Sequence, residues 1–351
     1  MQMLLCWGWL PPTLHTSEAG TGLEDLGSHT INSNTKGEAH LNWKSIDSRH
    51  QKFIKKISSA IPNNRSIPPT HIPKPKMPTH TLTTDDGITY HITLSGPSTS
   101  HSTILLTHAL MSNSRMWDST VRALHAAGHQ TLLFDHIGHN ATPPPSDPTK
   151  SYSTDSIVHH MHAIASRFAP AGRLKAVVGC SIGGVLALRY AMLYPEEVEV
   201  AVSLCAPGIT SPEATKSVWS ERIAHFESDV SSGSDSLCRA TAARWVPGDG
   251  ARDVAAREAA LGHTRTCSLE GYRVLADAIR GYDYAEELGR LRGVRCVVVA
   301  GGRDTASSVE VLRGIAEGIE GAEFVVLEEA GHIPPMQRPE EFEEVLLRAL
   351  R

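Results

Sequence analysis

The sequence predicts an α/β fold: a mostly parallel sheet with helices on both faces and an inserted helical cap. From residue 103 onward, short apolar runs rich in β-branched residues alternate with amphipathic helical segments. This alternation is typical of parallel strands buried between two helical layers. A long stretch, about Pro212–Gly281, has helical character and no strand of its own. It indicates an insertion over the carboxyl edge of the sheet, where open α/β sheets bind ligands.

A β-hairpin is expected first, because residues 77–96 alternate in polarity around a turn at Asp86-Gly87. Continuous apolar runs of strand length then predict the strands Thr103–Thr107, Thr131–Phe134, Leu174–Val178, Val198–Leu204, Val294–Ala300 and Glu323–Leu327. Apolar residues three and four apart predict the helices Trp117–Ala127, Ser156–Phe168, Ile182–Leu193, Val309–Ile319 and Glu340–Leu350.

The first 76 residues differ in composition from the rest of the 351-residue chain. They carry nine Lys/Arg and five Asp/Glu, a balance of +4, whereas the remaining 275 residues have a balance of −9. Seven of the 21 prolines lie there, with little apolar surface to offset the entropy of ordering. We therefore expect a disordered N-terminal extension over 1–76, with one short helical pattern around Ile46–Ile61. The domain organisation that follows is a core over 77–206, a helical cap over 207–285 and the rest of the core over 286–351.

Composition excludes several classes of protein. The net charge of −5 argues against nucleic-acid binding, and no apolar run reaches the roughly 18 residues of a membrane span. The apolar run Met3–Leu10 has no Lys or Arg before it, unlike a signal peptide. The six cysteines are spaced singly, which indicates free thiols and a cytoplasmic location. Since zinc, phosphate-loop and dinucleotide spacings are absent from the sequence, neither a metal nor a cofactor is expected.

The motif G-x-S-x-G places Ser181 between a predicted strand and a predicted helix. This context is the one in which the motif forms a nucleophile turn. Gly179 and Gly183 allow the strand and helix to approach closely, and the turn lifts the Ser181 hydroxyl above the sheet edge. Ser181 is therefore the predicted nucleophile.

The expected acid and base follow later strands in the order serine, acid, histidine. Asp304 comes after the strand Val294–Ala300, and His332 comes after Glu323–Leu327. Because parallel strands end at one edge, these side chains are expected to meet near Ser181, where His332 would act as general base and Asp304 would orient its imidazole. The alternative roles are a surface carboxylate and a residue that caps the last helix.

Two loops complete the predicted site. The strand Thr103–Thr107 runs into His108 and Ala109, so the backbone N–H of Leu110 is the expected oxyanion donor beside that of Ile182. A second loop, Asp-His-Ile-Gly-His from Asp135, forms a tight turn beside the nucleophile.

With these motifs the chain resembles the α/β-hydrolase superfamily over about Met77 to Leu350. That family usually has His-Gly in the first loop and Asp-x-x-Gly-His-Gly in the second, whereas Ala109 and Asn140 stand in place of the glycines here. The ending G-H-I-P-P-M-Q-R-P-E-E-F, which contains His332, is also similar to the family. The resemblance implies an α/β-hydrolase fold and a serine hydrolase.

Spaced segments of the cap resemble the 3-oxoadipate enol-lactonases: Ser217–Ile223, Ala243–Trp245, Leu269–Tyr272 and Ala278–Asp283. Three arginines of these segments are candidates to bind a substrate carboxylate, Arg222, Arg244 and above all Arg280; the alternative is that they are solvated helix charges. Trp219 and Trp245 are candidates to line an apolar pocket; the alternative is that they only pack the cap on the core.

The expected function is hydrolysis of an ester or lactone of a small molecule, in the narrowest form an enol-lactone, through Ser181, His332 and Asp304. Hydrolysis of a C–C bond and acyl transfer remain alternatives, because the same three residues serve both reactions and fold does not fix chemistry. A non-catalytic protein that binds a small molecule under the cap is the alternative outside the enzymes.

Overall fold

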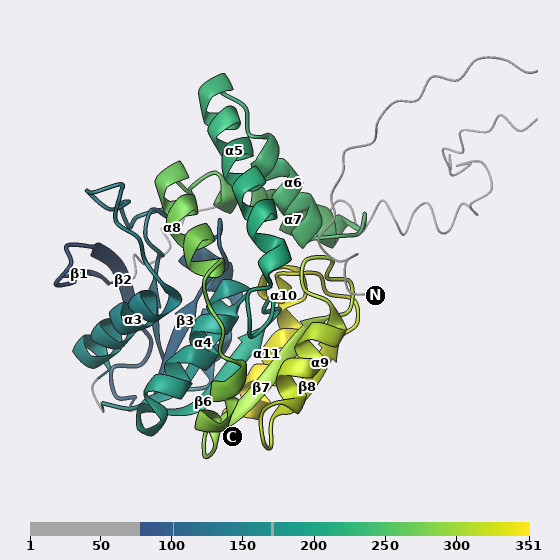
Figure 1. Cartoon of the computed structure of the whole chain (residues 1–351). Helices are drawn as coiled ribbons and strands as arrows, with labels where there is room; N and C mark the ends of the chain where they lie inside the picture. Colours follow the sequence, from purple (N-terminus) through teal and green to yellow (C-terminus); the bar gives the residue numbers. More distant parts are fainter. Residues whose placement is uncertain (1–77, 101, 170–171) are drawn as a thin grey trace, which may run out of the picture. The chain divides into compact units, whose positions relative to one another are not determined.

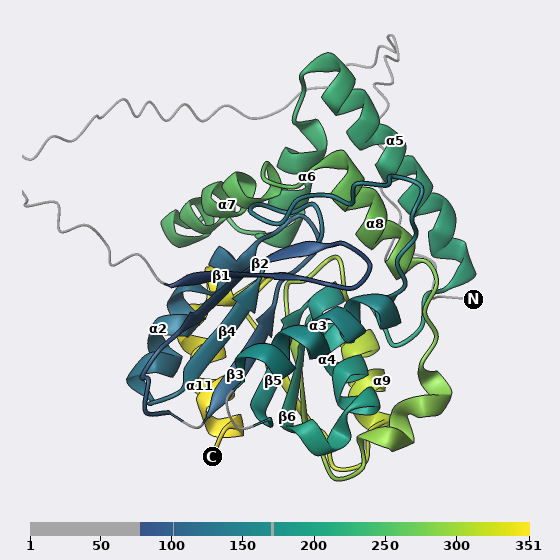
Figure 2. The same cartoon turned by 90° about the vertical axis from the view of Figure 1, so that its left-hand side faces the viewer.

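The computed structural model describes residues 78–100, 102–169 and 172–351. The predicted extension over 1–76 and the helical pattern at Ile46–Ile61 lie outside these ranges. The described residues contain one eight-stranded sheet with the order β1-β2-β4-β3-β5-β6-β7-β8. Helices α3 and α4 pack on one face, and α2 and α11 pack on the other (Figures 1 and 2). The predicted α/β class is confirmed.

The strands are β1 (Thr79–Thr83), β2 (Thr89–Ser95), β3 (Thr103–Thr107), β4 (Gln130–Phe134), β5 (Leu174–Cys180), β6 (Val198–Leu204), β7 (Arg295–Gly301) and β8 (Glu323–Leu327). The pairs β1–β2 and β2–β4 are antiparallel, and every other pair is parallel. The hairpin and the mostly parallel sheet are both confirmed. The side chains of β3 are buried throughout, and those of β5 and β6 nearly so, which explains their continuous apolar sequences.

The helices outside the cap are α2 (Asp118–Ala126), α3 (Thr154–Phe168), α4 (Ile182–Leu193), α9 (Val309–Glu317), α10 (Pro334–Gln337) and α11 (Pro339–Ala349), with a 3-10 turn η2 (Ser114–Trp117) before α2 and η3 (Pro195–Glu197) after α4. All but α10 agree with the predicted helices to within two residues. The helix α10 was not predicted, because four residues are too short to show a helical period.

The chain between β6 and β7 forms the turns η4 (Glu213–Thr215) and η5 (Ala285–Leu291) and the helices α5 (Lys216–Ser232), α6 (Ser236–Trp245), α7 (Ala251–Thr264) and α8 (Leu269–Ile279). These four helices gather at one end of the sheet (Figure 1). The predicted helical insertion is thus confirmed. In the part of the chain that the structure describes, no helix is long and apolar enough to cross a membrane.

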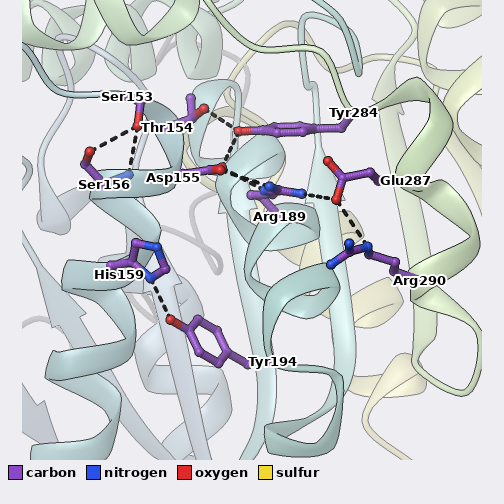
Figure 3. Close-up of polar contacts among 10 residues, drawn as sticks. All are labelled: Ser153, Thr154, Asp155, Ser156, His159, Arg189, Tyr194, Tyr284, Glu287 and Arg290. Atoms are coloured by element: carbon purple, nitrogen blue, oxygen red, sulfur yellow. Dashed lines mark hydrogen bonds and ion pairs between the residues drawn. The ribbon is translucent and has the colours of Figure 1, made fainter.

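An ion-pair network around the buried guanidinium of Arg189 joins α4 to its neighbours (Figure 3). The helix α4 begins next to Ser181. Arg189 of α4 donates to both carboxylate oxygens of Asp155 in α3, at 2.7 and 2.9 Å, and to Glu287 Oε2 in η5 at 2.9 Å. Tyr284 donates its hydroxyl to Asp155 Oδ1 at 2.7 Å. Burial opposes the charge of Arg189, yet these hydrogen bonds raise its pKa. The network therefore joins α3, α4 and η5 around one cation.

Candidate active site

Ser181 occupies the tight turn between β5 and α4, with φ 58° and ψ −122°. A non-glycine residue rarely adopts such a positive φ, so the surrounding fold must impose it. The two flanking glycines make the turn possible. A Cβ at Gly179 would lie 1.8 Å from the carbonyl oxygen of Gly183, and a Cβ at Gly183 would lie 2.4 Å from that of Thr107. The hydroxyl is thereby held at the amino end of α4.

His332 and Asp304 form a buried hydrogen-bonded pair. The Nδ1–H of His332 donates to Asp304 Oδ2 at 2.7 Å, and the two side chains are 4% and 0% exposed. The N–H of Ala306 donates to the other carboxylate oxygen, Oδ1, also at 2.7 Å. With both oxygens of Asp304 accepting hydrogen bonds, the carboxylate fixes the tautomer of His332 and leaves Nε2 free to accept a proton.

Glycines bring the loops of this pair together. A Cβ at Gly301 would lie 2.1 Å from the carbonyl oxygen of Gly331, and a Cβ at Gly302 would lie 2.5 Å from that of Glu328. The two loops therefore pack backbone against backbone. The cap also holds the histidine: the N–H of His332 donates to the carbonyl of Trp245 at 2.8 Å, and the two rings stack with centroids 6.1 Å apart.

Ser181 and His332 line one cavity. Leu110 and Pro207 belong to its core side, together with Met111, Ala306 and Ser307. The cap contributes Trp219, Arg222, Thr241, Arg244, Trp245, Tyr272 and Ile279. The structure thus brings the predicted serine, histidine, oxyanion loop and both tryptophans to one place.

Arg280 lies outside the cavity, whereas the sequence makes it a candidate to bind the substrate. Its guanidinium pairs with Asp277 and donates to Ser220 Oγ at 2.9 Å, and it does not line the cavity. Arg222 and Arg244 do line the cavity. The polar residues Thr241, Tyr272 and Ser307 also line it and were not predicted. Ser307 follows Asp304 by three residues in the same loop, a proximity that sequence reasoning did not use.

The predicted oxyanion donors lie next to the cavity: Leu110 lines it, and Ile182 directly follows Ser181, which lines it too. Ile182 is the first residue of α4, so its N–H has no acceptor within the helix. Leu110 follows β3 by three residues and lines the cavity. Across 78–100, 102–169 and 172–351, neither N–H forms a backbone or side-chain hydrogen bond. Both donors remain available for an oxyanion.

Ala109 and Asn140 stand where the α/β hydrolases usually have glycine, and the backbone at both positions accepts a side chain. Ala109 does not adopt a positive φ, so its methyl group causes no backbone strain. Asn140 has φ 46°, a region that asparagine tolerates better than most residues. Its amide donates to Asp135 Oδ2 at 2.7 Å, which holds the turn.

Three fully buried histidines join the loop after β3, which contains Leu110, to the turn after β4. His108 Nε2 accepts from the N–H of His136 at 2.9 Å, and His139 Nε2 accepts from the N–H of Met111 at 3.1 Å. Burial lowers the pKa of all three, and that of His139 to about 4. Because the neutral rings accept these bonds, His139 ties Met111, next to Leu110, to the turn after β4.

Among the described residues, the one group of potential metal ligands is Cys205, Asp304 and His332, whose donor atoms lie within 4.8 Å of one another. Burial raises the pKa of the Cys205 thiol well above its usual range. A thiol must lose its proton to bind a metal, and the other two residues are bonded to each other. This donor set therefore suits proton transfer better than metal binding.

A family model described as the alpha/beta hydrolase fold matches residues 102–339. The carbamate hydrolase RutD of Pseudomonas savastanoi pv. phaseolicola is 25% identical over 252 residues, which cover 70% of this chain and 92% of that protein. The enol-lactonase from Burkholderia xenovorans is 23% identical with a TM-score of 0.68, over 77% of this chain and 99% of its own. An esterase from Exiguobacterium antarcticum is 19% identical with a TM-score of 0.67, over 77% and 98%. With most of the chain matched by the family model, this protein belongs to the α/β-hydrolase family.

Proposed function

We propose that the protein is a serine hydrolase that cleaves an ester or lactone of a small molecule. The observation that carries the proposal is that Ser181 and His332 line one cavity while His332 donates to the buried carboxylate of Asp304. In this proposal residues 77–206 and 286–351 form the catalytic core and 207–285 form the cap.

The geometry supports a two-step mechanism. His332 Nε2 accepts the Ser181 proton as the hydroxyl oxygen attacks the carbonyl carbon, and Asp304 stabilises the imidazolium. The N–H groups of Leu110 and Ile182 hold the oxyanion, aided by the amino end of α4. His332 then gives its proton to the leaving oxygen, which departs. A water molecule deprotonated by His332 finally hydrolyses the acyl-enzyme and regenerates Ser181.

We propose lactones as one class of substrate, and enol-lactones as the most specific candidates within it. Its support is the resemblance of the cap segments to the enol-lactonases, together with the fold shared with the enol-lactonase from Burkholderia xenovorans. Hydrolysis of a lactone opens the ring, so the new acid and the leaving oxygen stay in one molecule. The cavity then releases a single product. C–C bond hydrolysis and acyl transfer use the same three residues and are separated by substrate tests.

Labelling with a fluorophosphonate probe tests the enzyme proposal. The wild-type protein should be labelled, Ser181→Ala should abolish labelling, and His332→Ala should slow it strongly. Ser220→Ala, a change at an exposed cap serine, is the matched control and should label like the wild type. A folded wild type that takes no label would contradict the proposal.

Comparing aryl esters with enol-lactones tests the substrate class. Turnover of aryl esters alone removes the lactone assignment.

A further inference from the structure

Two arginines of the cap face the cavity without acidic partners. Arg222 of α5 and Arg244 of α6 line it together with Ser181, and both side chains are half-buried. In the described part of the chain, neither guanidinium forms an ion pair with a carboxylate. Arg222 lies over the ring of Trp219, 5.2 Å from its centroid. The Nε of Arg244 is buried and has no hydrogen-bond partner.

Two other buried arginines in the described part of the chain are paired with carboxylates. Arg189 bonds to Asp155 and Glu287, and Arg338 bonds to Asp253 at 2.7 Å with both side chains largely buried. A guanidinium that is partly removed from water without a partner loses hydration and gains no ion pair in return. The arrangement of Arg222 and Arg244 therefore differs from the way this fold stabilises its structural arginines.

The two cations also repel each other. Burial lowers the pKa of both arginines, and the charge of Arg222 helps to lower that of Arg244 to about 10. Both remain protonated at neutral pH. Burial raises the pKa of the neighbouring Tyr272 to about 12, so this phenol supplies no negative charge. The charge of Asp304 acts on Arg244, but the two oxygens of Asp304 already bond to His332 and Ala306.

We propose that Arg222 and Arg244 form a subsite for an anionic group of the substrate, and that this group is one carboxylate. The inference rests on the proposed function, because it concerns the substrate that Ser181 attacks. The two arginines exceed the single carboxylate of Asp304 by one positive charge, which one substrate carboxylate would cancel. Its two oxygens suit the planar fork of a guanidinium.

Ser307 gives a second polar group for the same ligand. It lines the cavity, is 3% exposed, and its hydroxyl has no hydrogen-bond partner. A buried hydroxyl without a partner costs free energy, so a bound acceptor or donor would stabilise it. The bound substrate would thus extend from its carboxylate at the cap to its scissile carbonyl at Ser181. A neutral ester of the same length leaves the arginines unpaired.

A pair of esters that differ only in the distal group tests the subsite. We compare kcat/KM for para-nitrophenyl hydrogen adipate, which carries a carboxylate, with kcat/KM for para-nitrophenyl hexanoate. The wild type should prefer the adipate ester by about tenfold or more, the size expected for a charge-assisted hydrogen bond. Arg222→Met and Arg244→Met should each lower the ratio of the two kcat/KM values, adipate ester over hexanoate, by about tenfold. Arg244→Lys should retain part of the preference for the adipate ester.

Arg280→Met is the matched control, because it removes the same charge from the cap at an arginine outside the cavity. It should leave the ratio as in the wild type. An equal fall in this control, or a ratio that Arg222→Met and Arg244→Met do not change, would overturn the subsite. Circular dichroism checks folding, and a variant that does not fold is replaced by Arg222→Gln or Arg244→Gln.

Fluorophosphonate labelling of the same samples separates this inference from the proposed function. A labelled wild type without preference for the adipate ester overturns the subsite alone, whereas a folded wild type without label overturns the hydrolase proposal. In the second case, titration of free adipate followed by tryptophan fluorescence still tests the subsite. Adipate should bind to the wild type and at least about tenfold more weakly to Arg244→Met; absence of binding to the wild type overturns the inference. Where the wild type is labelled, inorganic phosphate and adipate can also be compared as inhibitors of labelling. If phosphate blocks labelling more strongly than adipate, the assignment of the anionic group as a carboxylate is wrong.

Discussion

His332 Nδ1 lies 2.7 Å from Asp304 Oδ2, and the carboxylate of Asp304 is completely buried. The pair is formed by two loops that follow neighbouring parallel strands, β7 and β8. In the proposed mechanism, this bond leaves the Nε2 of His332 to accept the Ser181 proton. The orientation of the imidazole therefore depends on a single carboxylate oxygen.

Asp304→Asn should lower kcat by roughly 10⁴-fold. The amide would present either a weaker acceptor or an N–H donor to Nδ1, and a donor would stabilise the tautomer with the proton on Nε2. Hydrolysis of para-nitrophenyl acetate measures the loss. Asp249→Asn, at an exposed loop position, is the control and should keep wild-type activity. Activity of Asp304→Asn within tenfold of wild type would show that another group orients the histidine.

Gly183→Ala should destabilise the protein by about 1–3 kcal/mol, as overpacking of a tight site does. The added methyl group would lie 2.4 Å from the carbonyl oxygen of Thr107 and 3.0 Å from that of His108, which belong to the backbone before the oxyanion loop. Gly314→Ala in α9 is the matched control, because a Cβ there meets nothing within 4 Å. It should stabilise the protein by about 0.4–1 kcal/mol. Urea unfolding measures both, and equal effects would contradict the close approach at Gly183.

His139 should make the free energy of unfolding fall as the pH is lowered from 6.5 towards 4, because burial lowers its pKa from 6.5 to about 4. In this pH range the unfolded chain binds a proton at His139 that the folded protein does not bind. The contribution of His139 to the free energy of unfolding is therefore fully present above pH 6.5 and decreases as the pH falls towards 4. One such group contributes a slope of about 1.4 kcal/mol per pH unit.

His139→Gln removes the titrating group and keeps an acceptor for the N–H of Met111. Urea unfolding at several pH values should show a slope smaller by about 1.4 kcal/mol per unit between these limits. Above pH 7 the pH dependence of the two proteins should coincide, which serves as the internal control. An unchanged slope at low pH would mean that His139 is protonated in the folded protein.

The sheet and the three residues Ser181, Asp304 and His332 could be predicted because each residue follows a strand. Strands β3, β6 and β8 have the predicted bounds. For β3 and β6 the reason is that a continuous apolar run marks both ends of a buried strand. Parallel strands then bring the residues after them to one edge.

The cap residues could not be predicted in the same way. The buried residues of α5 and α6 recur at helical spacing, but this pattern does not tell whether the buried face meets the core or a cavity. The sequence makes Arg280 a candidate together with Arg222 and Arg244, but Asp277, three residues earlier, pairs with Arg280 outside the cavity. Similarly, the bond of His139 to Met111 joins residues 28 positions apart and has no local signal.

Arg189→Met should lower the free energy of unfolding by about 1–3 kcal/mol, less than for a fully buried pair because water screens the half-exposed carboxylates. The change leaves Asp155 and Glu287, which are 41% and 31% exposed, without their cation. Arg292→Met is the control, since its ion pair with Glu320 is 81% and 73% exposed and should contribute less than about 1 kcal/mol. Urea unfolding at neutral pH measures both variants, and equal effects would contradict a structural role for the network.

The stabilising effect of Arg189 should also depend on pH. Its hydrogen bonds hold the pKa of Asp155 below the ordinary value of 3.8, so Asp155 contributes stability above 3.8 that is lost as the pH falls through its folded-state pKa. The difference in unfolding free energy between wild type and Arg189→Met should therefore narrow below pH 3.8. Because Arg189 fixes α4, which begins next to Ser181, the variant should also take fluorophosphonate more slowly at neutral pH while still folded. An unchanged labelling rate would show that the glycine turn alone holds the nucleophile.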